Sequence, residues 1–123
     1  LLLAYPPLSG GNAPQKPVAG LLGVTAGQTG IYYYGASSHA HRALMAPYLI
    51  QWEAMKFCRA RGCRRYDLLG IGPPGSGADH PWAGVTEFKT KFGGTTVVYP
   101  PEQERILRPA ARLALRTKRR LLG

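Results

Sequence analysis

The sequence predicts one α+β domain with a mixed, mostly antiparallel sheet and packed helices. Short β-favouring runs rich in Leu, Val, Ile and Tyr are separated by clusters of Gly and Pro. They alternate with segments whose apolar residues recur at helical spacing. The chain of 123 residues is long enough for one compact domain, and its hydrophobic content of 45% indicates a packed core.

The first part of the chain predicts three antiparallel strands. Residues 1–5 and 18–24 are apolar runs, and the turn-forming residues 6–14 between them predict a long loop. Glycines within residues 26–30 indicate a second turn, which leads into the β-favouring segment 31–34. We therefore expect a strand meander at the start of the fold.

A helix is expected over residues 41–61, because Gly62 stands where a left-handed C-terminal cap is common. Pro47 is compatible only with the first turn of a helix, so the regular helix is expected to begin there. Apolar side chains occupy more than one helical face, which predicts a mostly buried helix. Trp52 and Met55 are accordingly expected to pack in the core.

The next segments predict a strand over residues 66–71 and a glycine-rich loop over residues 70–77. This loop is interpreted as a connection and not as a phosphate cradle, because its two adjacent prolines lack the N–H groups that a cradle would donate. A short helix is expected over residues 85–92. A last strand is expected over residues 95–99.

The C-terminal segment 105–123 predicts a basic amphipathic helix, which divides the chain into a partial domain, residues 1–104, and this helix. Its arginines recur at intervals of three or four and share one stripe: Arg105, Arg108, Arg112, Arg116 and Arg119. Such a stripe suits an anionic membrane or RNA. It suits equally a helix docked on the domain with its arginines in water.

The chain is strongly basic, with 16 Lys and Arg against 6 Asp and Glu and a net charge of +10. This charge favours a polyanionic partner, such as nucleic acid, anionic lipid headgroups or a pyrophosphate-bearing substrate, and a solvated basic face is the alternative. We find no membrane-length apolar run and no signal peptide, so a cytoplasmic location is expected, with peripheral contact at the inner face of the plasma membrane left open. The chain begins at Leu1 inside a predicted strand, which suggests the C-terminal piece of a longer protein.

The two cysteines, Cys58 and Cys63, have no histidine or second cysteine pair at zinc-ligand spacing. They are expected to be reduced and structural. No metal and no cofactor are expected.

The predicted order of elements resembles the later part of the GNAT acyltransferase fold. There, a strand that runs into a helix N-terminus forms the acyl-donor site, where free N–H groups and the helix dipole favour phosphate or an oxyanion. Here that terminus would follow residues 35–38, with Ser37 and Ser38 available as caps or hydroxyl donors. Coenzyme-A-dependent members carry a basic, glycine-repeating loop, whereas this chain has Gly35 alone. This difference counts against coenzyme A as donor, so an acyl-coenzyme-A-dependent N-acyltransferase is only the second interpretation.

Three segments in a fixed order carry a closer resemblance: YYYGASS at residues 32–38, YDLLGI at 66–71 and FKTKFGG at 88–94. Together they resemble the Fem family of peptidoglycan aminoacyltransferases, which look like two fused GNAT-type domains, over about residues 17–99. The resemblance implies transfer of glycine, alanine or serine from aminoacyl-tRNA. The acceptor would be a side-chain amine of the stem peptide in a lipid-linked or nucleotide-linked muropeptide precursor.

The resemblance implies a catalytic role for Lys89, which occupies the lysine of the family's Phe-Lys motif. Its cation would stabilise the oxyanion of ester aminolysis. Four residues are expected to bind substrate, namely Tyr34, Ser37, Ser38 and Phe88, and three to bind tRNA or phosphate, namely Arg42, Arg112 and Arg116. From the residues alone, a simpler interpretation is that Lys89 and Lys91 are exposed on a turn whose Phe88 and Phe92 enter the core.

Two further questions stay open at this level. Asp67 is expected to pair with an arginine in preference to acting as a base. A third hypothesis of a different class is a non-catalytic basic module that binds RNA or an anionic membrane through its arginine stripe.

Overall fold

The computed structural model describes residues 1–7, 16–101, 103, 105 and 117. The chain divides into two compact units, Leu1–Gly93 and Gly94–Gly123. All the strands and helices that position the site belong to the first unit. Arg112 and Arg116, and with them most of the predicted arginine stripe, lie outside the described residues.

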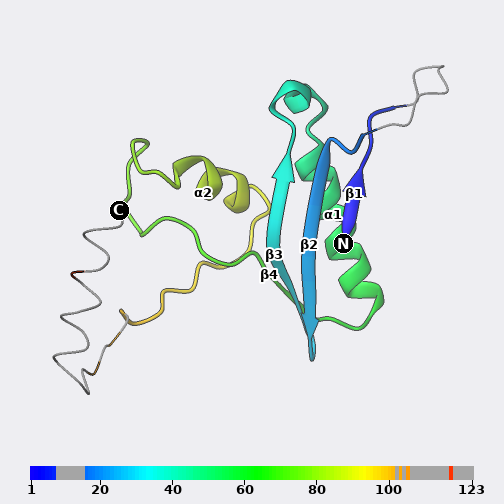
Figure 1. Ribbon diagram of the computed structural model, residues 1–123. Coiled ribbons are helices and arrows are strands. Elements are labelled where there is room, and N and C mark those ends of the chain that lie inside the picture. The colour runs from blue at the N-terminus through cyan, green and yellow to red at the C-terminus, as the bar shows by residue number, and fades with distance from the viewer. Residues whose placement is uncertain (8–15, 102, 104, 106–116, 118–123) are drawn as a thin grey trace. The chain divides into compact units, whose positions relative to one another are not determined.

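A four-stranded sheet forms the centre of the first unit, in the order β1-β2-β3-β4 (Figure 1). Its strands are β1 (Leu2–Ala4), β2 (Ala19–Ala26), β3 (Thr29–Ser37) and β4 (Arg65–Asp67). The first three are antiparallel neighbours, and β4 runs parallel to β3. The expected meander and the mixed, mostly antiparallel α+β class are therefore confirmed.

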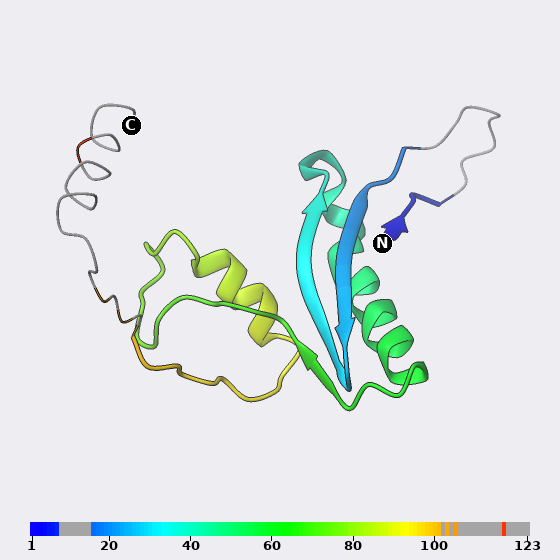
Figure 2. The same cartoon turned by 60° about the horizontal axis from the view of Figure 1, so that its bottom comes forward.

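A helical segment connects β3 to β4. It consists of a 3₁₀ helix, η1 (His39–Leu44), and the helix α1 (Ala46–Ala60), which carries Pro47 in its first turn. After α1, Gly62 has a φ of +84°, the left-handed conformation expected at a helix end. Both views show α1 along one face of the sheet (Figure 1, Figure 2).

The core lies between α1 and this face of the sheet. Leu21 of β2 is buried against Ile50 and Ala54 of α1, with Tyr32 and Tyr66 packed at the edge of the cluster. A second cluster joins Val18 and Ala19 to Ala46. Burial of these apolar groups provides the main driving force that holds the helix on the sheet.

The helix α1 buries one face only, which corrects the expectation of a mostly buried helix. Its buried stripe is formed by small and medium side chains and one glutamine: Ala46, Ile50, Gln51, Ala54 and Cys58. Trp52 is 57% exposed and Phe57 49% exposed, so the prediction that Trp52 packs in the core is wrong. The physical reason is that a single sheet covers a helix on one side.

Two further expectations meet different outcomes. The short helix is present as α2 (Ala83–Thr90), whereas residues 95–99 are not a strand. β-favouring side chains alone do not make a strand, because the backbone N–H and C=O groups of a strand need a neighbouring strand as partner. Cys58 and Cys63 are both free thiols, as expected.

Within the described ranges, no helix combines the length and the apolar character needed to cross a membrane.

Candidate functional site

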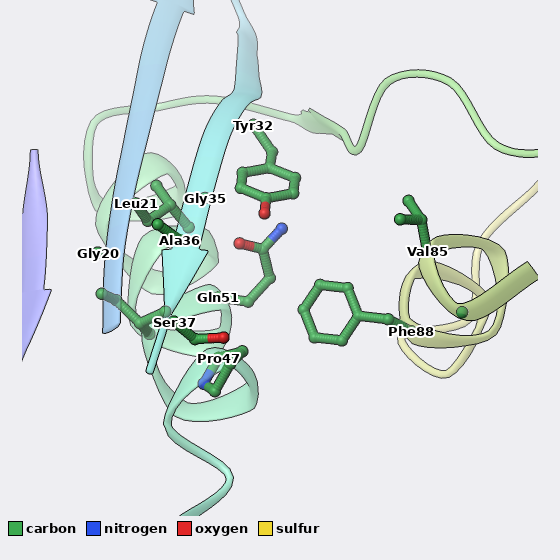
Figure 3. Close-up of a pocket in the computed structure, with 12 residues that line it drawn as sticks. Gly20, Leu21, Tyr32, Gly35, Ala36, Ser37, Pro47, Gln51, Val85 and Phe88 are labelled. Carbon is green, nitrogen blue, oxygen red and sulfur yellow. The ribbon is translucent and has the colours of Figure 1, made fainter. Parts of the chain in front are cut away.

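A cavity of about 250 Å³ lies where β3, the first half of α1 and α2 approach one another (Figure 3). The wall from β2 and β3 includes Tyr32, Gly35 and Ser37. The side chains of α1 and α2 complete the lining, and among them are Pro47, Ile50, Gln51, Val85 and Phe88. The sheet and both helices therefore contribute to one small chamber.

Tyr32 forms one wall of this cavity, and its ring also lies near the Lys89 ammonium. Its ring is partly buried, and burial raises the pKa of its hydroxyl, which stays neutral at physiological pH. A Cβ atom built at Gly35 would overlap the Tyr32 hydroxyl. The glycine of the YYYGASS segment is thus required for the ring to lie over the strand.

Gln51 is the most deeply buried polar residue beside the cavity. Its side chain is 1% exposed, and its Nε2 has no hydrogen-bond partner among the described residues. In Figure 3 the amide lies next to the Tyr32 hydroxyl, with the Phe88 ring facing it from α2. Gln51 was not predicted as a site residue, although its i+3 and i+7 spacing to Ala54 and Cys58 puts it on the helix face that α1 buries.

Lys89 lies near the ring of Tyr32. Its ammonium donates a hydrogen bond of 2.7 Å to the carbonyl of Gly70 and lies 5.6 Å from the centre of the Tyr32 ring. Lys89 does not itself line the cavity of about 250 Å³. Tyr32 lines this cavity, and the ammonium of Lys89 lies near the Tyr32 ring. Burial lowers the pKa of Lys89, and the charge of Asp67 offsets part of this effect.

A tight turn after β4 positions the carbonyl that holds Lys89. Asp67 Oδ1 accepts a hydrogen bond of 2.7 Å from the backbone N–H of Leu69, which has a φ of +59°. Left-handed backbone is unusual for leucine, and such outliers cluster at functional sites. The Asp67 carboxylate is exposed and, among the described residues, pairs with no arginine, so the arginine partner expected for it is not found.

Phe88 lines both the main cavity and a second one of about 190 Å³. Its ring meets Tyr48 edge-on at 5.0 Å between centroids and Phe92 at 5.3 Å. Ser37 lines both cavities as well. The three rings of Tyr48, Phe88 and Phe92 pack α2 against the start of α1. Phe88 and Ser37 therefore line the same two cavities.

Ser38 and Arg42 line the second cavity. Ser38 Oγ lies 3.0 Å from Nδ1 of His41, and Arg42 donates a hydrogen bond of 2.9 Å to Nε2 of His39. The guanidinium of Arg42 is exposed and retains further donors. This side of the site is therefore basic, whereas no charged side chain lines the main cavity.

The helix N-terminus expected after Ser38 is not that of an α-helix. The 3₁₀ helix follows Ser38, and α1 begins only after Met45, whose φ is +50°. Pro47 removes one of the first N–H groups of α1. The oxyanion site expected from helix N–H groups thus lacks the N-terminus of an α-helix directly after Ser38.

Tyr34, which was predicted to bind substrate, and Lys91, which was not, lie apart from this arrangement. Tyr34 is 67% exposed and pairs with Leu22. Because Leu21 faces α1 and neighbouring strand residues alternate, Leu22 and Tyr34 lie on the opposite face of the sheet. Lys91 is exposed and forms an ion pair of 2.6 Å with Glu87.

In the part of the chain that is described, no group of three His, Cys, Asp or Glu side chains could hold a metal ion.

Comparison with known proteins adds family information. A family model described as the FemAB family matches residues 8–105. The lipid II:glycine glycyltransferase of Staphylococcus haemolyticus is 35% identical over 77 residues, which are 62% of this chain and 18% of that protein. The aminoacyltransferase FemA of Staphylococcus aureus is 30% identical over 69 residues, 56% of this chain and 16% of that protein. No solved structure matches.

Proposed function

The chain belongs to the FemAB family, and from this we propose that it is part of an aminoacyltransferase that builds the interpeptide bridge of peptidoglycan. The reaction moves glycine, alanine or serine from aminoacyl-tRNA to a side-chain amine of the stem peptide in a muropeptide precursor. The matched relatives are named as a glycyltransferase acting with lipid II and as an aminoacyltransferase. The chain spans less than a fifth of their length, so the activity of the whole protein is part of the proposal, as is a GNAT-like fold.

One observation carries the catalytic assignment: the partly buried ammonium of Lys89 lies 5.6 Å from the ring of Tyr32, which forms a wall of the cavity of about 250 Å³. Phe88 and Lys89 are adjacent in the Phe-Lys motif, and Phe88 lines the cavity itself. The motif thus places an aromatic side chain in the chamber and a cation beside it.

The proposed chemistry is aminolysis of an ester. The neutral amine of the stem peptide attacks the carbonyl carbon that joins the amino acid to tRNA, and the carbonyl oxygen becomes an oxyanion. Collapse of this intermediate forms the amide bond and breaks the ester bond, and the terminal ribose of tRNA leaves as a hydroxyl after receiving the proton that the amine loses. A cation fixed beside the oxyanion lowers this barrier by about 3–4 kcal/mol where one strong donor is involved.

Lys89 suits this role because its position is fixed and its charge is partly desolvated. The hydrogen bond to Gly70 uses one of the three N–H donors of the ammonium, which leaves two for the oxyanion. Electrostatic attraction is stronger in a partly buried site than in bulk water. The Asp67 charge favours the protonated form that the reaction needs.

The basic surface supports the proposed partners. Arg42 lines the second cavity and is available for a phosphate of the tRNA acceptor end. Arg112 and Arg116 stay sequence-based proposals for the same partner, as does peripheral contact with an anionic membrane. A net charge of +10 favours any of these polyanions. A cytoplasmic location agrees with the use of charged tRNA.

The test supplies the full-length protein with tRNA charged with labelled glycine, alanine or serine, and with lipid-linked or nucleotide-linked precursor. We expect label on the stem peptide, and its position follows from mass spectrometry. Consumption of labelled acetyl-coenzyme A without any transfer from tRNA would contradict the proposal.

A further inference from the structure

The amide of Gln51 is a buried polar group without a partner at the wall of a cavity. Its side chain is 1% exposed, and its Nε2 makes no hydrogen bond within the described part of the chain. Buried donors in folded proteins are nearly always paired, since an unpaired one forfeits its bonds to water. Gln51 also lines the chamber, so a group seated against this side chain is a source for the missing partner of its donor.

The lining of the chamber restricts what this ligand group can be. Its side chains are neutral: Leu21, Tyr32, Ser37, Pro47, Ile50, Gln51, Val85 and Phe88. A phosphate, carboxylate or ammonium would lose its hydration there without an opposite charge beside it, which is costly. A neutral polar group with a carbonyl oxygen can accept from Nε2 and leave its apolar flanks against Ile50 and Phe88.

The size of the chamber restricts the ligand further. Sites that enclose drug-sized molecules measure roughly 300–1,000 Å³, whereas this cavity measures about 250 Å³. It therefore takes one short segment of a larger substrate. An amide unit of a peptide, with one small side chain, satisfies both the size and the neutral lining.

We propose that this cavity binds a neutral amide group of the precursor's stem peptide, and that Gln51 Nε2 donates a hydrogen bond to the carbonyl oxygen of that amide. The inference rests on the proposed function for the identity of the peptide. It assigns Gln51 as a positioning residue, which holds the acceptor chain in the cavity that Tyr32 also lines, while the Lys89 ammonium lies near the Tyr32 ring.

The test measures the affinity of a synthetic stem pentapeptide for the full-length protein by calorimetry, without tRNA. In Gln51→Leu the lost hydrogen bond is expected to weaken binding about five- to tenfold. Thermal stability should be unchanged or higher, because leucine removes a buried unpaired donor and keeps a similar volume. An unchanged affinity in this variant would overturn the inference.

The matched control is Tyr66→Phe. The Tyr66 hydroxyl is the other buried side-chain group without a partner among the described residues, and Tyr66 does not line the cavity. Its removal should leave the pentapeptide affinity within twofold of the unsubstituted protein. An equal loss of affinity in both variants would show a general structural effect and would overturn the assignment of Gln51.

Kinetics separate this inference from the proposed function. In Gln51→Leu the KM for the precursor should rise about five- to tenfold, with the KM for aminoacyl-tRNA and kcat unchanged. If the unsubstituted protein binds the pentapeptide through Gln51 but transfers no label, the proposed function fails and the subsite stands. If transfer proceeds and Gln51→Leu has an unchanged precursor KM, the function stands and the subsite fails.

Discussion

The two lysines at the end of α2 occupy opposite environments although only one residue separates them. Lys89 is partly buried, bonds to the carbonyl of Gly70 far along the chain, and has its pKa lowered by burial. Lys91 is exposed, pairs with Glu87 one helical turn away, and has its pKa raised by that hydrogen bond. One side of α2 faces Tyr32 and the cavity, and the other faces water.

This difference shows that one helix can carry two kinds of contact: local contacts within the helix and contacts that depend on the rest of the fold. Contacts of Lys91 would form in almost any isolated helix, because residues four apart are neighbours on its surface. Contacts of Lys89 require the β4 turn and the Tyr32 ring to be in place. A desolvated cation held by the tertiary fold is the more suitable group for catalysis.

The largest expected effect is on turnover. Lys89→Met keeps the length of the side chain and removes its charge, so kcat for aminoacyl transfer should fall about 10²–10³-fold. The measurement is single-turnover transfer of label from aminoacyl-tRNA to precursor. Lys91→Met is the matched control and should remain within twofold of the unsubstituted protein. Equal losses in the two variants would remove the distinction between the two sides of α2.

A second substitution tests the cavity-facing side through Tyr32. In Gly35→Ala the added Cβ would overlap the Tyr32 hydroxyl, and displacement of the ring should cost about 1–3 kcal/mol of the free energy of unfolding. Urea unfolding measures this cost. Gly77→Ala is the control, because a Cβ there meets nothing within 4 Å. A similar stability for both variants would mean that the Tyr32 ring does not lie over Gly35.

A third substitution changes the charge near Lys89. The Asp67 carboxylate raises the pKa of Lys89, so Asp67→Asn should lower that pKa further. The protonated form is then lost at a lower pH, and the alkaline limb of the kcat/KM profile should move toward neutral pH. A profile that does not move, or that moves toward higher pH, would contradict the coupling of the two groups.

The smallest expected effect is on the solvent-facing side. Glu87→Gln removes the carboxylate that pairs with Lys91, and the pKa of Lys91 should fall toward its usual value. Exposed ion pairs contribute little to stability. We expect no measurable change in melting temperature by calorimetry and no change in transfer rate. A clear loss of activity would show that Glu87 contributes to transfer, which contradicts its assignment to the solvent-facing side of α2.

The sequence predicts the local elements well where one residue fixes the backbone. Pro47 and Gly62 set the ends of α1, and the turn residues set the strand meander, because these signals act within a few residues. Trp52 was misplaced because the apolar residues of α1 occupy more than one face, and only the sheet decides which face is covered. Residues 95–99 were misplaced because β-propensity does not supply a partner strand.

The candidate site likewise has residues that sequence motifs indicate and residues that only the tertiary fold reveals. The resemblance indicated Phe88, Lys89, Ser37 and Ser38. Phe88, Ser37 and Ser38 line one or both of the two cavities, and Lys89 lies near the ring of Tyr32, which lines the main one. Their roles remain predictions. Gln51 could not be assigned a role from sequence, because its significance depends on burial and on the absence of a partner. The resemblance also indicated Tyr34, but its pairing with Leu22 puts it on the sheet face opposite α1, which only the register of β2 and β3 reveals.

The central claim is that the Lys89 ammonium stabilises the oxyanion of the tetrahedral intermediate. The most direct measurement is the affinity of a phosphonate analogue of this intermediate, in which an anionic oxygen replaces the oxyanion, for the full-length protein and for Lys89→Met. The account predicts that Lys89→Met binds the analogue about 100-fold more weakly while its affinity for aminoacyl-tRNA is unchanged. Equal affinity of both proteins for the analogue would contradict it.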